Sequence, residues 1–147
     1  MFRRVLYLIT ALLIFIVIYD AIFHNKSNKN EVLIGGKTYF VGIADTPDLQ
    51  EKGLSGRRQL ETNEGMLFVF DKPDKYGFWM KDMLFPIDII WISDKYTVVY
   101  IEKSLLPNTY PQIFTPDIFS KYVLEVTAGE AEKLNIKIGD SVQFLKK

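Results

Sequence analysis

The stretch that decides the fold is residues 65–92, GMLFVFDKPDKYGFWMKDMLFPIDIIWI. It contains three runs rich in aromatic and β-branched residues, at residues 66–70, 77–81 and 87–92, and such runs favour β-strands. Asp-Lys-Pro-Asp and Leu-Phe-Pro separate the runs, and both are typical of turns. Strands this short and this closely spaced predict a mainly β domain.

Further β-rich runs lie on both sides of this stretch. Residues 32–34 and 37–43 flank Gly35-Gly36, a pair that tolerates positive φ, so they predict a hairpin. Later strands are expected at residues 97–102, 122–126 and 141–145. Residues 104–119 contain three prolines among polar spacers and predict a long loop, which is uncommon unless it is functional or mobile.

Two short helices are expected. Thr46 can cap the first, Pro47 suits its first turn, and Gly53 ends it, with Leu49 and Leu54 facing the core. The second is opened by a capping box, Thr127-Ala128-Gly129-Glu130, and runs to Leu134. Asn135 then tolerates the left-handed exit.

Together these elements predict an all-β fold. We expect a compact barrel or sandwich of short, mostly antiparallel strands with two short helices, preceded by one transmembrane helix. The globular domain is expected to span residues 31–147 and to fold without the segment before it.

The amino terminus has the composition of a membrane segment. Residues 5–23 are nearly all apolar and as a helix would be roughly 28 Å long, close to the hydrocarbon thickness of a bilayer. Arg3 and Arg4 precede the run, which predicts a cytoplasmic amino terminus and an extracytoplasmic domain. Residues 1–23 are therefore interpreted as a single-pass anchor or signal-anchor, and residues 24–30 as a polar tether. A cleaved signal peptide is the alternative, although no small-residue cleavage site is evident.

The composition excludes several kinds of chemistry. The chain has no cysteine, and its one histidine, His24, lies before the domain, so thiolate sites and histidine-dependent triads are excluded there. No metal motif or phosphate-binding loop is present, so no cofactor and no transition metal are expected. From Glu31 onward 14 basic residues face 17 acidic ones, and this mildly acidic balance makes a nucleic-acid partner unexpected.

The central motifs resemble those of the domain of unknown function 192 family. The resemblance rests on Gly53-Leu54, Arg57, Gly65-Met66-Leu67-Phe68, Phe78-Trp79-Met80-Lys81 and Pro86-Ile87-Asp88, and it extends over residues 37–144. It implies a fold and no established reaction. The chain departs from the family pattern at Ser55, Asp82-Met83 and Asn135, and the change beside Lys81 alters the local charge.

Four polar residues stand in otherwise apolar sequence and are candidate ligand-binding residues: Arg57, Lys81, Asp82 and Asp88. Asp88 lies between two isoleucines, where a solvated charge is unexpected. Either it forms a structural salt bridge, with Arg57 or Lys81, or a turn-fixing hydrogen bond, or these residues line a ligand pocket. No residue is assigned a catalytic role.

Aromatic residues and methionines flank these candidates in the sequence, and one interpretation is that they pack in the core. The other is an apolar wall for a ligand, with Trp79 or Trp91 as a stacking platform for a sugar or an aromatic group. We expect a membrane-anchored, non-catalytic binding or accessory module for a small molecule or glycan. The alternative is a small enzyme that uses two carboxyl groups on an extracytoplasmic substrate.

Overall fold

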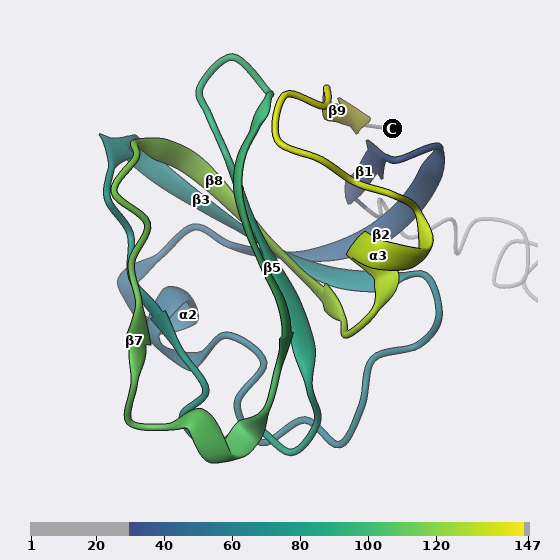
Figure 1. Ribbon diagram of the computed structural model, residues 1–147. Helices are drawn as coiled ribbons and strands as arrows, with labels where there is room; N and C mark the ends of the chain where they lie inside the picture. The colour runs from purple at the N-terminus through teal and green to yellow at the C-terminus, as the bar shows by residue number, and fades with distance from the viewer. Residues whose placement is uncertain (1–29, 146–147) are drawn as a thin grey trace, which may run out of the picture.

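A computed structural model describes residues 30–145, which form one seven-stranded sheet and one two-stranded sheet (Figure 1). The large sheet has the order β6-β5-β8-β3-β2-β1-β9. Its strands are β1 (Asn30–Ile34), β2 (Lys37–Ala44), β3 (Glu64–Asp74), β5 (Ile87–Ile92), β6 (Val98–Leu105), β8 (Ser120–Thr127) and β9 (Gln143–Leu145). The small sheet pairs β4 (Phe78–Trp79) with β7 (Ile113–Phe114).

Helices are few and short, as the sequence predicts. They are α2 (Pro47–Lys52), α3 (Glu130–Lys133) and a 3-10 turn, η1 (Pro107–Thr109). The mainly β class with two short α-helices is therefore confirmed. The expected long loop at residues 104–119 differs, because η1 and β7 give it regular structure.

The strand order is that of an open sheet, so the expected barrel or sandwich is not fully formed. All neighbouring strands are antiparallel except β2 and β3, which run parallel and are joined by a crossover that includes α2. The two edges of the sheet nevertheless meet at one end. The Val98 N–H donates to the Asp140 carbonyl at 2.9 Å, and the Val142 N–H donates to the Tyr96 carbonyl at 2.8 Å.

The β1–β2 hairpin and the first helix form as the local sequence dictates. Gly35 and Gly36 have φ of 58° and 77°, so they supply the positive dihedrals that a two-residue hairpin turn requires. The Thr46 side chain accepts from the Leu49 N–H, and α2 ends at Gly53. The prediction for Leu49 is wrong, because that side chain is exposed while Leu54 is buried.

Two apolar clusters lie on the two faces of the large sheet. Strand alternation separates them: in β8, Leu124 and Val126 join one cluster and Val123 joins the other. We call the first the α3 face; it also includes Val32, Ile34, Tyr39, Ile90, Ile92 and Ala131. We call the second the α2 face; it also includes Leu54, Phe68, Phe78, Met80, Ile89 and Trp91.

The predicted capping box at Thr127 is wrong. Helix α3 begins after Gly129, whose φ is 87°, and no side chain of its own segment caps it. Asp88 takes that role from a neighbouring strand, as described below. Asn135 has φ of 52°, which confirms the left-handed exit from this helix.

The expected anchor and tether, residues 1–29, lie outside the described residues, as do residues 146–147. Within residues 30–145 no helix has the length and apolar character needed to cross a bilayer.

Candidate functional site

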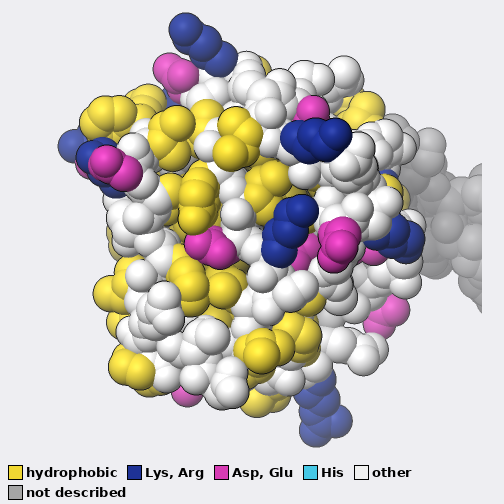
Figure 2. All heavy atoms as spheres, in the orientation of Figure 1, with side chains coloured by type: hydrophobic (Ala, Val, Ile, Leu, Met, Phe, Trp, Pro, Cys, Tyr) yellow, Lys and Arg dark blue, Asp and Glu magenta, His cyan; other side chains and the backbone are white. Residues whose placement is uncertain are grey.

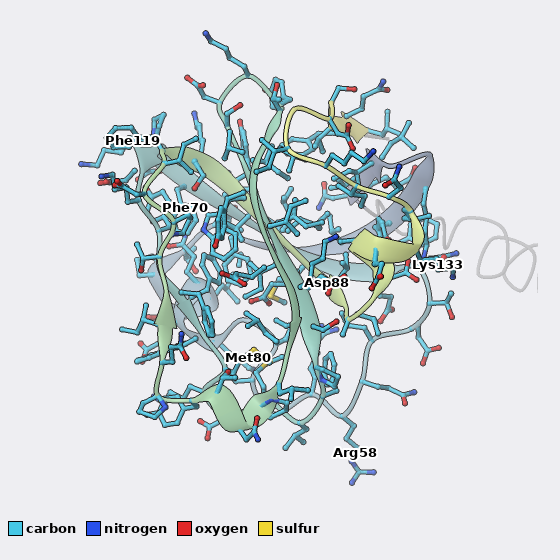
Figure 3. All side chains as sticks on the ribbon, viewed as in Figure 1. Arg58, Phe70, Met80, Asp88, Phe119 and Lys133 are labelled. Atoms are coloured by element: carbon cyan, nitrogen blue, oxygen red, sulfur yellow. The ribbon has the colours of Figure 1, made fainter. Side chains whose placement is uncertain are left out.

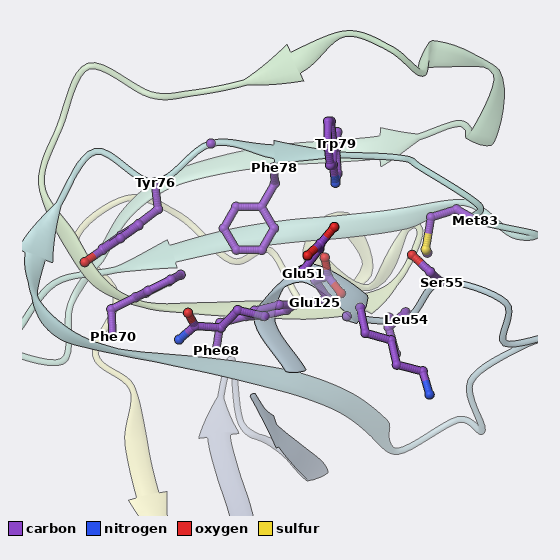
Figure 4. Close-up of a pocket in the computed structure, with 14 residues that line it drawn as sticks. Glu51, Leu54, Ser55, Phe68, Phe70, Tyr76, Phe78, Trp79, Met83 and Glu125 are labelled. Atoms are coloured by element: carbon purple, nitrogen blue, oxygen red, sulfur yellow. The ribbon is translucent and has the colours of Figure 1, made fainter. Parts of the chain in front are cut away.

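A pocket opens on the α2 face, between α2 and the segment that leads into β4 (Figure 4). Its cavity volume is about 140 Å³. Apolar walls come from Leu54, Phe68, Phe70, Tyr76, Phe78 and Met83. Polar side chains stand along α2 and the turn after it: Gln50, Glu51, Lys52 and Ser55. Glu125 and Trp79 complete the lining.

Glu125 is the one buried carboxyl in this lining. It lies on the interior strand β8, opposite Met66 of β3 and Ile89 of β5, and only 4% of the residue is exposed. No group among the described residues hydrogen-bonds to its Oε2 atom. Burial raises the pKa of Glu125 to about 8, because the charged form is poorly solvated there. At neutral pH the pocket therefore contains a protonated carboxyl group.

The aromatic walls are fixed by contacts among themselves. The Phe68 and Phe78 rings meet edge to face with centroids 4.8 Å apart, and Phe70 stacks on Tyr76. The Trp91 indole N–H donates to the Tyr76 carbonyl at 2.9 Å, which ties the segment before β4 to the sheet. Because these rings are held by neighbours, the pocket is formed before any ligand enters it.

Gly53 keeps the inner part of the pocket open. Its φ is +47°, and a Cβ at this position would stand 3.2 Å from the Phe68 ring and 3.9 Å from Glu125 Oε2. A side chain here would be strained and would enter the space beside the carboxyl group. Gln50 fixes α2 against strand β3, because its Nε2 donates to the Val69 carbonyl at 2.9 Å.

Of the predicted site residues, Trp79 lines the pocket and three others line neighbouring hollows. Trp79 is 40% exposed and meets the Tyr110 ring at 5.9 Å, and the Lys81 Nζ lies 5.4 Å from its ring centre. Lys81 and Asp82 line a neighbouring hollow that shares Glu51, Lys52 and Ser55 with the pocket. Arg57 lines another hollow, which also shares Lys52 and Ser55 with the pocket.

Asp88 lies on the opposite side of the sheet, among the residues of the α3 face (Figure 3). It is fully buried and accepts three backbone hydrogen bonds. The donors are the N–H groups of Ser104 at 2.8 Å, Gly129 at 3.1 Å and Ala131 at 2.8 Å. The predicted turn-fixing role is thus observed, while the predicted ion pair with Arg57 or Lys81 is absent from the described residues.

Glu125 is the site residue that sequence reasoning missed. It lies in a Tyr-Val-Leu-Glu-Val run, and a lone carboxylate in a strand apolar on both faces is the same signal that singles out Asp88. A metal is not indicated for either carboxyl group. Among residues 30–145, no cluster of three or more His, Cys, Asp or Glu side chains is arranged to hold one.

The surface is mixed in charge. On the face seen in Figure 2, basic side chains lie singly among acidic and hydrophobic ones. This face therefore presents no continuous basic patch of the kind that tracks a nucleic-acid backbone.

The chain belongs to the domain of unknown function 192 family, described as "Uncharacterized ACR", which matches residues 30–144. It is similar to a solved "putative transcription regulator" from Sinorhizobium meliloti 1021, with 29% identity and a TM-score of 0.72 over 79% of this chain and 92% of that one. It is also similar to a protein of unknown function from Novosphingobium aromaticivorans DSM 12444. That match has 32% identity and a TM-score of 0.72 over 78% of this chain and 83% of the other. No curated protein matches the chain.

Proposed function

We propose that this member of the family is a non-catalytic binding module that takes part of a small molecule into the Glu125 pocket. The observation that carries the proposal is the carboxyl oxygen that is buried in the described pocket without a partner. Burying a polar group without a hydrogen bond costs roughly 1–3 kcal/mol in proteins. A buried group left without a partner requires an explanation, and because Oε2 borders an open pocket, a ligand that supplies the missing partner accounts for it.

We further propose that the module is membrane-anchored and lies outside the cytoplasm. The support is the sequence of residues 5–23, with two arginines before it, and the polar residues 24–30 that follow. A reporter fused to the carboxyl terminus that is active only outside the cytoplasm tests this orientation. Activity of a reporter that works only in the cytoplasm would contradict it.

Replacing Glu125 by leucine tests the binding proposal. Leucine is of similar size and needs no hydrogen-bond partner, so Glu125→Leu should raise the free energy of unfolding by roughly 1–3 kcal/mol. Ligand binding in the pocket should be lost. The measurements are thermal unfolding of the full-length protein in nonionic detergent and a thermal-shift screen of small molecules.

The matched control is Glu132→Leu, at an exposed position on α3, which should change neither property. A clear loss of stability in Glu125→Leu would mean that Glu125 serves the fold, and would contradict the proposal.

A carboxylate-based enzyme is the second candidate, and one observation favours it. Glu51 of α2 lines the same pocket as Glu125, so an exposed and a buried carboxyl face one space (Figure 4). Glycosidases use two carboxyl groups that flank the scissile bond. If the protein releases reducing ends from a glycan and Glu51→Gln abolishes this release, the enzyme replaces the binding module as the better description.

We do not extend regulation of transcription to this chain. Its support among the comparisons is the name given to one similar solved structure. The excess of acidic over basic residues from Glu31 onward opposes binding to a phosphate backbone.

A further inference from the structure

We propose that the occupant of the Glu125 pocket is a small organic cation, a primary ammonium on an aromatic or alkyl group, whose N–H bonds to Glu125 Oε2. The inference rests on the proposed binding function and names the chemical class of the ligand. The apolar part of the ligand would pack against Phe68 and Phe78, deep in the pocket.

The first argument concerns charge. Three other titratable side chains line the pocket, namely Glu51 and Lys52 from α2 and Tyr76 from the segment before β4. Among the described residues no basic group forms an ion pair with Glu125. The carboxyl group therefore has no internal counter-ion that would stabilise its charged form, and a cationic ligand would stabilise that form and supply the missing hydrogen bond.

The second argument concerns the walls. The aromatic rings around Glu125 have electron-rich faces, which attract ammonium groups, and such attraction strengthens when water is excluded. Rings and carboxyl group together accommodate a cation better than either does alone. A neutral sugar would match the rings but would gain nothing from a negative charge on the carboxyl group.

The third argument concerns size. The cavity of about 140 Å³ is close to an engineered apolar cavity of about 150 Å³ that binds benzene. One ring or one short alkyl chain with its ammonium group therefore fits, whereas a disaccharide would reach out past Trp79 and the rim. Gly53 sets this limit, since a side chain there would occupy the space beside Oε2.

The main competitor is a neutral ligand with a hydrogen-bond acceptor. A protonated Glu125 could donate to such an acceptor, and so could the amide of a glutamine at this position. A cation distinguishes the two residues, because only glutamate can become negatively charged. The variant Glu125→Gln therefore separates the two ligand classes without a change in side-chain size.

The experiment is titration calorimetry of full-length protein in nonionic detergent at pH 7. The probes are benzylammonium, butylammonium and the neutral analogue benzyl alcohol. We expect wild type to bind an ammonium at least about tenfold more tightly than it binds benzyl alcohol. The affinity for the ammonium should be lower in Glu125→Gln than in wild type. Because the pKa of free Glu125 is about 8, binding should also release close to one proton, which makes the heat depend on the buffer.

Glu132→Gln is the matched control and should bind like wild type, since its side chain is exposed on α3 and does not line the pocket. Equal binding of an ammonium by wild type and Glu125→Gln would overturn the inference, and so would the absence of any ammonium binding. Binding of benzyl alcohol to wild type as tightly as an ammonium, with the same affinity in Glu125→Gln, would overturn it while leaving the proposed function intact. The proposed function fails separately if Glu125→Leu is destabilised.

Discussion

The two faces of the sheet each bury one carboxyl group, and the two groups differ in their hydrogen bonding. On the α3 face, Asp88 accepts hydrogen bonds from three backbone N–H groups. On the α2 face, Glu125 Oε2 has no partner among the described residues. The two residues lie on adjacent strands, with Ile89 directly opposite Glu125. Burial alone therefore does not distinguish an acid whose hydrogen bonds are satisfied within the fold from one that lacks a partner; the donors around it do.

The surroundings of each carboxyl group extend this contrast. Around Asp88, Glu130 of α3 is paired with Lys37 and accepts from the Tyr39 hydroxyl, so the polar groups of that region satisfy one another. Around Glu125 there are aromatic rings and an open cavity. On the α3 face, hydrogen bonds and an ion pair connect segments that are distant in sequence. On the α2 face, an open cavity remains.

The largest expected effect comes from Asp88→Ala. It leaves three N–H groups without their acceptor, that of Ala131 buried and those of Ser104 and Gly129 partly buried, so the loss should be roughly 3–5 kcal/mol. Denaturant or thermal unfolding of the full-length protein measures it. A melting temperature equal to that of wild type would remove the distinction between the two faces.

The next effect is a pH dependence that belongs to Glu125. The unfolded chain loses this proton near pH 4.5, whereas the folded protein holds it up to about pH 8. The folded state binds more protons in this window, so stability should fall as the pH rises from about 4.5 to 8, by at most roughly 1.4 kcal/mol per pH unit. Melting temperatures across this range should show the trend in wild type.

Glu125→Gln is the control for that trend, since it keeps the size of the side chain and removes the titration. The difference between the two proteins isolates the contribution of this one group from all other ionisations. An identical pH dependence in both would mean that Glu125 is solvated in the folded protein, and the contrast with Asp88 would disappear.

The smallest effect comes from Tyr39→Phe on the α3 face. The variant removes the 2.7 Å hydrogen bond to Glu130, which keeps Lys37 as a partner, so the loss should be about 0.5–1.5 kcal/mol. Tyr100→Phe removes a bond of the same length to Glu102, from a pair on strand β6. Because Tyr39 is almost fully buried, its replacement should cost more. Equal losses would show that the α3 network is no more protected from water than a pair on β6.

Local features of the fold were predictable from the sequence. The Gly-Gly hairpin, the Thr46 cap and the left-handed Asn135 depend on residues within a few positions of one another. The same reasoning failed at Thr127, because the acceptor that opens α3 is a carboxylate 41 positions away from Gly129. It failed for the sheet as well, since strand order depends on pairings between distant segments.

The candidate site was predictable only in part. Of the two tryptophans that are candidate stacking platforms, Trp79 lines the pocket, whereas Trp91 is fully buried in the core. Asp88 was correctly marked as unusual, but its partners lie on β6 and around α3, which periodicity does not reveal. Glu125 is likewise a lone carboxylate in an apolar strand, and sequence reasoning did not select it. What separates the two acids is the presence or absence of nearby donors, and that is a property of the three-dimensional fold.

The pairing of β1 with β9 has a consequence for how the protein is made. Glu31 lies opposite Leu145, so the first described strand finds its second neighbour only when the last one is available. Until residue 145 has left the ribosome, β1 exposes unpaired backbone groups that can recruit another chain. Contacts this distant in sequence also slow folding, because a long loop must close first. A nascent chain of this protein thus has an interval in which a chaperone that covers strand edges would protect it from aggregation.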